Sequence, residues 1–264
     1  MRLYHMGEFG GAASAVALGT FDGVHLGHQA LLREAVSAAR RLGLPALALT
    51  FDRHPLSVVK PESAPPALCG PEEKRRVMAE LGLDGVVEWK FTPEFARQTP
   101  EEFIRLPQGE LRPAAMAAGF NYSFGASGSG SSATLRHLGE ELGFESAAFE
   151  PVCVDGEPVS SSRIRSLLMD GEIKLANRLL GRPYRLELTR EGQEYLALAG
   201  RVIPRNGRYL GDISEGNLPP RTVEFILRGQ RIRFFGAVDS LNANIVLLSL
   251  QDMARENSAE SLNS

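Results

Sequence analysis

Short apolar runs recur along the first part of the chain. They occupy residues 13–18, 45–51, 84–89 and 114–118. The first and last of them run into Gly19 and Gly119. Runs this short and this apolar are typical of strands that are buried on both faces of a sheet.

Between these runs, apolar side chains recur at the spacing of an α-helix. Residues 27–42 and 71–81 carry this pattern, and Gly43 and Gly82 follow them as C-terminal caps. Thr99 opens a Thr-Pro-Glu-Glu segment, which has the form of a capping box. Strands that alternate with helices predict an α/β fold, with a mostly parallel sheet and helices on both of its faces.

The pattern changes after residue 183. Short segments of alternating polarity follow, separated by Gly, Pro and Asn turns, at 184–188, 195–203, 222–227, 231–235 and 245–250. Such segments predict a small antiparallel sheet or barrel. We therefore expect two domains, an α/β domain over residues 1–183 and a small, mostly antiparallel β domain over residues 184–264.

Composition narrows the possible classes of protein. Of 264 residues, 43% are hydrophobic and 23% charged, as in ordinary globular proteins. The apolar stretches are far shorter than the about 20 residues of a membrane helix, and the net charge of −3 provides no basic field for nucleic acid. Cys69 and Cys153 form no CxxC pattern, so we expect neither a disulfide framework nor structural zinc, and a cytoplasmic location.

The most informative segment, Gly19–His28, lies between the first predicted strand and the first long helix. Its glycines allow a tight turn, and a helix that starts near Gly27 favours a phosphate through its unpaired N–H groups. His25 and His28 are three residues apart and can both donate to phosphate oxygens. Two alternatives remain open, namely a metal site and a turn with solvated histidines.

A second candidate segment contains three serines and two arginines at the start of a helix. Serines at this position are also good N-caps, so Ser161 and Ser162 have a purely structural interpretation. Capping does not explain Arg163 and Arg165, because cations in the first turn oppose the helix dipole. A bound polyphosphate would turn this repulsion into attraction, and Arg165 is the preferred direct contact.

Two further segments follow predicted strands. Gly119–Gly125 combines aromatic residues with Asn121, and could stack a flat ring or simply close the core. Residues 50–55 end the second strand, where His54 is either a ligand or a structural hydrogen-bonding residue. The Gly/Ser run at 125–132 lacks the lysine of a phosphate loop and is either a lid or a surface loop.

Residues 18–32 resemble the opening motif of the nucleotidyltransferase domain of bacterial FAD synthetases, the bifunctional riboflavin kinases/FMN adenylyltransferases. Further similar segments follow in the family's order, at 50–55, 69–74, 91–95, 119–125 and 159–184. The last contains S-S-S-R-I-R and A-N-R-L-L-G-R-P-Y. The resemblance thus covers about the first 184 residues.

This resemblance implies a Rossmann-like domain that transfers the adenylyl group of ATP to FMN, with FAD and pyrophosphate as products. The catalytic residues it implies are His25, His28 and Arg165. The expected nucleotide contacts are Gly19, Phe21, Asp22, Gly27, Ser161, Ser162 and Arg163. The expected flavin contacts are Asn121, Phe51, His54 and Phe124. Mg²⁺ would be bound mainly by the nucleotide phosphates and water, without a metal site on the protein.

Some residues depart from the family's pattern. Relatives usually carry basic residues after the Phe-Gly pair, where this chain has Ala126–Ser129, and Arg53 replaces a proline. Two alternatives to FMN adenylyl transfer therefore stay open: a non-catalytic protein that binds flavin or nucleotide, and an adenylyltransferase for another phosphorylated acceptor.

The C-terminal segment departs further. It is shorter than the family's riboflavin kinase barrel and lacks a G-x-P-T-x-N segment, although Glu224 lies in a segment similar to the strand with the catalytic glutamate. We therefore expect that kinase activity is lost.

Overall fold

The computed structural model describes residues 1–10, 13–192, 194–214, 219–235 and 245–253. Contacts divide the chain into two compact units. Unit 1 comprises Met1–Pro65 and Pro71–Val159, and unit 2 comprises Pro66–Gly70 and Ser160–Ser264. The division after Val159 comes earlier in the chain than the predicted domain boundary at 183, because the two helices after Val159 group with the barrel. The domain boundary itself stays a prediction.

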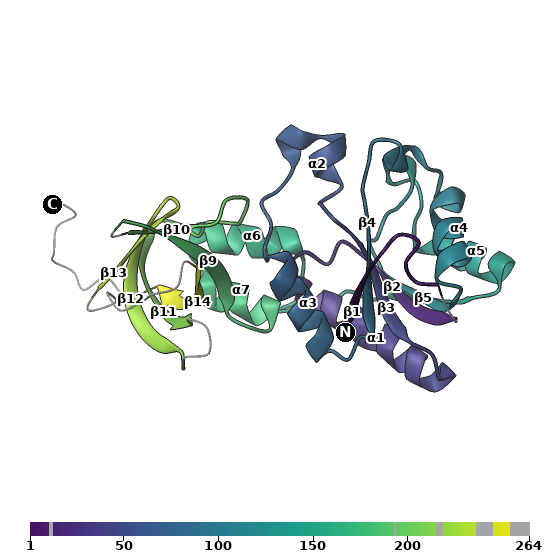
Figure 1. The fold of residues 1–264 in the computed structure, drawn as a ribbon, viewed down its shortest axis with the longest axis horizontal. Coiled ribbons are helices and arrows are strands. Elements are labelled where there is room, and N and C mark those ends of the chain that lie inside the picture. The colour runs from purple at the N-terminus through teal and green to yellow at the C-terminus, as the bar shows by residue number, and fades with distance from the viewer. Residues whose placement is uncertain (11–12, 193, 215–218, 236–244, 254–264) are drawn as a thin grey trace. The chain divides into compact units, whose positions relative to one another are not determined.

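Unit 1 is a six-stranded sheet with helices (Figure 1). Its strands are β1 Arg2–His5, β2 Ser14–Leu18, β3 Ala46–Phe51, β4 Gly85–Trp89, β5 Pro113–Gly119 and β6 Glu145–Phe149. Its helices are α1 Leu26–Leu42, α2 Leu56–Val59, α3 Pro71–Glu80, α4 Pro100–Glu110 and α5 Ser132–Leu142. The short elements are η1 Asp22–Val24, η2 Pro61–Ser63, η3 Phe95–Arg97, η4 Ala126–Gly128, β7 Cys153–Val154 and β8 Glu157–Pro158. The sheet is parallel in the order β1-β4-β3-β2-β5-β6, so the predicted α/β class is confirmed.

The central strand β2 shows how the sheet is buried on both faces. Ala15 and Ala17 pack in one core cluster with residues of α1 and α3. Val16 and Leu18 pack in another with residues of α4 and α5. Because successive side chains of a strand point to opposite faces, one apolar run supplies both cores.

The predicted helix ends depend on local backbone chemistry. Gly43 ends α1 in the left-handed region, with φ 67°, and Thr99 forms the predicted capping box with Glu102. Sequence analysis missed β1, β6 and α5. Both ends of β1 and the first residue of β6 are exposed, and α5 is capped by Ser131, near the end of the Gly/Ser run for which a lid or a surface loop was expected.

The strand order places a topological switch point beside β2. The chain passes from β2 to β3 on one side, whereas β5 continues to β6 on the other. In open parallel sheets, ligands bind in the crevice at the carboxyl ends of the strands beside such a point. The segments that follow β2 and β5 contain the candidate residues around His25 and Asn121.

Unit 2 joins two helices to a closed antiparallel barrel (Figure 1). The helices are α6 Ser161–Asp170 and α7 Ile173–Leu180, and the strands are β9 Tyr184–Glu191, β10 Glu194–Ala197, β11 Gly207–Ser214, β12 Arg221–Arg228, β13 Arg231–Phe234 and β14 Ile245–Met253. Asn177 attaches α7 to the barrel, because its Nδ2 donates to the Leu250 carbonyl at 2.8 Å and its Oδ1 accepts from the Tyr184 N–H at 2.7 Å.

The barrel confirms the predicted antiparallel β domain, with two errors of detail. The strand predicted at 195–203 ends at Ala197, and β11 was missed. Gly211 lowers the strand propensity of β11, but a Cβ there would lie 2.6 Å from the Ser249 carbonyl oxygen, so the close approach of β14 requires glycine. No helix among the described residues is both long and apolar enough to cross a membrane.

We predict that Gly43→Ala lowers the free energy of unfolding by about 1 kcal/mol, because an alanine strains the left-handed cap. Nothing lies within 4 Å of the added Cβ, so the cost comes from the backbone alone. Gly109→Ala is the matched control, since Gly109 lies inside α4 with equally open space. It should raise stability by about 0.5 kcal/mol. Urea denaturation measures both, and equal effects of the two variants would contradict the cap argument.

Candidate functional site

The turn after β2 is built from strained backbone. Phe21 and Val24 lie in the left-handed region at φ 51° and 39°, and Gly23 lies there at φ 77°. For a β-branched residue such as Val24 this conformation is a genuine outlier. The Phe21 ring covers Gly19, where a Cβ would lie 2.9 Å from it. Strain of this kind persists only where surrounding contacts impose it, and it clusters at functional sites.

Hydrogen bonds from three elements hold this turn. The Thr20 carbonyl accepts from Thr50 Oγ1 of β3 at 3.2 Å and from Lys74 Nζ of α3 at 3.1 Å. Gln29 Nε2 of α1 donates to the Val24 carbonyl at 3.0 Å. The turn is therefore fixed at both of its ends.

The two histidines lie together at the start of α1. His25 is the N-cap, and its Nδ1 accepts from the His28 N–H at 3.3 Å. The two rings stack with centroids 3.7 Å apart, and the Phe21 ring meets His28 edge-on at 5.4 Å. A helix N-terminus leaves its first N–H groups without intrahelical acceptors, so both imidazoles lie beside a partial positive charge.

The surroundings of His28 disfavour its charged form. Burial lowers its pKa well below the usual 6.5, and the positive charges of His25 and Lys74 lower it further. Its Nδ1 is buried and has no hydrogen-bond partner among the described residues. At neutral pH the site therefore holds a neutral imidazole with one unused polar atom.

The remaining predicted residues of this turn lie in it or at its edge. Asp22 is buried within η1, and Gly27 lies in the first turn of α1 with its Cβ position 3.2 Å from the His25 ring. Among the described residues, no three His, Cys, Asp or Glu side chains gather closely enough to hold a metal ion. The candidate site of unit 1 is therefore the turn between β2 and the N-terminus of α1.

The segment after β5 has two kinds of residue. Asn121 is exposed, close to the end of the strand. Phe124 is buried in the core, with its ring centroid 5.3 Å from Phe103 and 6.0 Å from Tyr122. Burial also raises the pKa of the Tyr122 phenol. Phe124 therefore lies in the hydrophobic core, which agrees with the interpretation that this segment closes the core. A contact between Phe124 and flavin stays a prediction.

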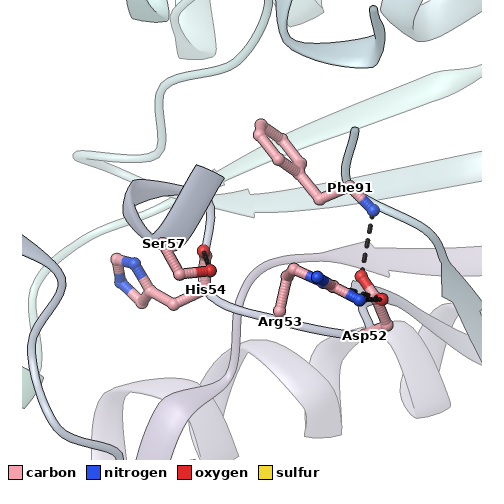
Figure 2. A network of polar contacts seen from close by, with 5 residues as sticks. All are labelled: Asp52, Arg53, His54, Ser57 and Phe91. Carbon is pink, nitrogen blue, oxygen red and sulfur yellow. Dashed lines mark hydrogen bonds and ion pairs between the residues drawn. The ribbon is translucent and has the colours of Figure 1, made fainter. Parts of the chain in front are cut away.

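Figure 2 shows the polar residues at the end of β3. The Arg53 Nε donates to Asp52 Oδ2 at 2.9 Å, and the Phe91 N–H donates to Oδ1 at 3.0 Å. Partial burial alone would raise the pKa of Asp52, but these hydrogen bonds outweigh it and lower the pKa. The His54 imidazole points away from this pair, and its Nδ1 accepts from the Leu56 N–H at 3.2 Å.

Aromatic rings gather beside this end of β3. Phe51 meets Phe91 at 5.0 Å and Phe95 at 5.5 Å between centroids. Phe51 itself is buried, whereas Phe91 and Phe95 are half-exposed. The Trp89 ring meets Phe95 edge-on with centroids 5.9 Å apart, and its Nε1 has no hydrogen-bond partner among the described residues. Phe91 and Phe95 were not among the predicted site residues, although both belong to segment 91–95, which resembles the family.

The serine–arginine segment lies in unit 2. Ser160 is the N-cap of α6, with its side chain accepting from the Arg163 N–H at 3.2 Å, so Ser161 and Ser162 begin the helix. Arg165 is buried, and its Nε donates to the Pro66 carbonyl at 2.9 Å. Capping is thus the role of Ser160, and the contacts of Ser161 and Ser162 with a nucleotide stay a prediction.

The structure therefore gathers Gly19, Phe21, Asp22, His25, Gly27 and His28 on one turn. Asn121 and His54 follow β5 and β3, the two strands that flank β2 in the same sheet. Lys74 also contacts this turn, and it was not among the predicted site residues. The available signal was segment 69–74, which resembles the family and ends at this lysine. The residues of α6 belong to the other unit, and their approach to the histidine turn stays a prediction.

Comparisons with known proteins identify the chain's relatives. Residues 11–163 match the sequence model of a family described as FAD synthetase. The bifunctional riboflavin kinase/FMN adenylyltransferase of Escherichia coli K12 is 34% identical over 209 residues, covering 78% of this chain and 63% of that protein. The FAD synthetase of Listeria monocytogenes is 29% identical over 214 residues, covering 80% of this chain and 87% of that protein.

The chain spans less than two thirds of the length of the bifunctional E. coli relative. Among solved structures, one described as a macrolide-efflux protein from Streptococcus pneumoniae matches with a TM-score of 0.86 at 24% identity. The match covers 99% of this chain and 93% of that chain. At this identity the similarity shows the fold alone.

The lowered pKa of His28 predicts a pH dependence of stability. In the unfolded chain the imidazole binds a proton near pH 6.5, whereas the folded site resists it. Stability contributed by the neutral ring is thus fully present above pH 6.5 and lost as the pH falls from there, by at most about 1.4 kcal/mol per pH unit.

Urea unfolding across this pH window checks the effect. His28→Asn should flatten the decline relative to the wild type, because the titrating group is gone. His137→Asn is the control, since this exposed histidine of α5 should leave the slope unchanged. A wild-type slope in His28→Asn would remove His28 as its source.

Proposed function

Because this chain belongs to the FAD synthetase family, we propose that it transfers the adenylyl group of ATP to FMN. The observation that carries the proposal is the strained turn with both histidines at the N-terminus of α1, beside the switch point of a parallel sheet. This is the place where such a sheet binds ligands, and a helix N-terminus suits phosphate.

The proposed reaction is a displacement at phosphorus. A phosphate oxygen of FMN attacks the α-phosphorus of ATP and forms a new P–O–P bond. The bond between the α-phosphorus and the bridging oxygen to the β-phosphate breaks, and pyrophosphate leaves with that electron pair. Such transfer needs positioning and stabilisation of negative charge more than a covalent nucleophile.

In this proposal, the histidine turn binds the phosphates of ATP. The Nδ1 of His28 is buried and has no hydrogen-bond partner among the described residues, and its ring is stacked on His25. An N–H on either imidazole can therefore donate to a phosphate oxygen. An incoming polyanion offsets the positive charges that lower the pKa of His28, so nucleotide binding favours its protonation. Gly19, Phe21, Asp22 and Gly27 shape the turn that presents these groups.

The start of α6 is proposed to contact the opposite side of the phosphates. The Nε of Arg165 donates to the Pro66 carbonyl, which orients the guanidinium, and a planar guanidinium suits phosphate oxygens. Ser161, Ser162 and Arg163 lie in the first helical turn, where N–H groups and hydroxyls favour phosphate.

The flavin contacts are proposed for the neighbouring strand ends. Asn121 is exposed and offers an amide to the edge of a ring. Phe51 and His54 lie at the end of β3, beside the half-exposed rings of Phe91 and Phe95, which extend the predicted apolar surface. Phe124 supports this surface from within the core.

Magnesium is proposed to arrive with ATP, coordinated by phosphates and water. We also propose that riboflavin kinase activity is lost and that the protein acts in the cytoplasm. Glu224 supports the first point, because Arg208 pairs with both of its oxygens and lowers its pKa, which opposes a role as a general base.

A second candidate is adenylyl transfer to another phosphorylated acceptor. Residues 126–129 carry no cation for the acceptor phosphate, and the Arg53 guanidinium is engaged by Asp52. These two observations favour testing acceptors other than FMN.

We expect the purified protein to form FAD and pyrophosphate from FMN, ATP and Mg²⁺. Chromatography measures FAD, and a coupled assay measures pyrophosphate. Riboflavin with ATP is the parallel reaction, and it should yield no FMN. Pyrophosphate release with another phosphorylated acceptor but not with FMN would favour the second candidate. Tight binding of FMN without either product would indicate a non-catalytic protein.

His28→Ala should lower kcat/KM for FAD formation by about 2–4 kcal/mol, the usual loss for one electrostatic donor to a transition state. His137→Ala, on the exposed face of α5, is the matched control and should retain wild-type activity. Circular dichroism verifies that both variants fold. Wild-type turnover in His28→Ala would exclude His28 from the mechanism.

A further inference from the structure

Lys74 reaches the histidine turn from a different helix. Its Nζ donates to the Thr20 carbonyl at 3.1 Å, and the side chain is half-buried. An ammonium group has three N–H donors, so this contact leaves two of them available. Among the residues that the structure describes, no carboxylate is paired with Lys74.

The contact with Thr20 is redundant as a structural support. The same carbonyl already accepts from Thr50 Oγ1 at 3.2 Å, so it would keep a hydrogen bond without Lys74. A half-buried cation also loses hydration without gaining a counter-charge. A purely structural role therefore does not account for a lysine at this position.

The charge of Lys74 acts on the site itself. It lies close enough to His28 to lower the pKa of that imidazole, together with His25. The ammonium group and the two imidazoles thus share one electrostatic environment at the N-terminus of α1. Cations arranged in this way stabilise an anion placed among them.

We propose that Lys74 is a binding residue for the triphosphate of the nucleotide, anchored to the Thr20 carbonyl through one N–H and donating its other two to phosphate oxygens. The inference rests on the proposed function and adds a cation from α3 to the histidine turn. The anchor fixes the ammonium without a carboxylate partner, so its full charge stays available to the ligand.

The test measures binding of ATP with Mg²⁺ in the absence of any acceptor, by isothermal titration calorimetry. Lys74→Met should weaken ATP binding about 10- to 100-fold, the range for losing charge-assisted hydrogen bonds. Binding of adenosine, which has no phosphate, should change less than about twofold. Lys74→Arg retains the charge and should recover most of the affinity.

Arg76→Met is the matched control, because it removes a positive charge from the same helix α3, where Arg76 pairs with Glu80 and is exposed. It should bind ATP like the wild type. In nuclear magnetic resonance titrations of the free protein, Lys74→Met should raise the pKa of His28, and Arg76→Met should not.

The outcomes separate this inference from the proposed function. Wild-type ATP affinity in Lys74→Met, or equal losses for ATP and adenosine, would overturn the role of Lys74. If the wild type bound no ATP, both the role of Lys74 and the proposed adenylyl transfer would be contradicted. Suppose that the wild type binds ATP, that Lys74→Met does not, and that the wild type makes no FAD from FMN. The binding role of Lys74 would then be supported, and FMN adenylyl transfer would be contradicted.

Discussion

The candidate site depends on the Thr20 carbonyl, which two side chains from other elements hold in place. Thr50 and Lys74 both donate to it, and directly after it the backbone enters the left-handed region at Phe21. A second left-handed residue, Val24, follows before α1 begins. Each such conformation costs of order 1–3 kcal/mol, so the turn keeps its shape only because surrounding contacts impose it, and the Thr50 hydroxyl holds the Thr20 carbonyl even without Lys74. The shape in turn places His25 at the N-cap of α1.

The proposed phosphate site lies in a chain with a net charge of −3. Because the protein as a whole would not attract a polyanion, the proposal requires attraction from local groups. The turn concentrates a helix N-terminus, two imidazoles and one ammonium group in unit 1. Unit 2 offers a helix start of its own, where the Nε of the buried Arg165 donates to the Pro66 backbone carbonyl. In both places a backbone carbonyl accepts a hydrogen bond from a cationic side chain.

Sequence patterns predicted the elements whose signals are local. The apolar run that became β2, the Gly43 cap and the Thr99 capping box each depend on a few adjacent residues. Strand β11 could not be predicted in this way, because Gly211 is required by the approach of β14 from about 40 residues further along the chain. The same holds for the site. The histidine motif is visible in the sequence, whereas the contact between Lys74 and Thr20 spans 54 positions and appears only in the fold.

The barrel of unit 2 is connected by backbone hydrogen bonds to the helix that contains Arg165. Its interior is filled by buried side chains, among them Tyr209 and Phe225 with stacked rings, and Glu224 is neutralised by Arg208. Its attachments lead instead to α6. The Arg205 N–H donates to the Leu168 carbonyl of α6 at 3.1 Å, and the Val202 N–H donates to Ala67, in the short segment whose Pro66 carbonyl holds Arg165. Because this segment belongs to the same compact unit, these hydrogen bonds connect the barrel with the helix that contains Arg165.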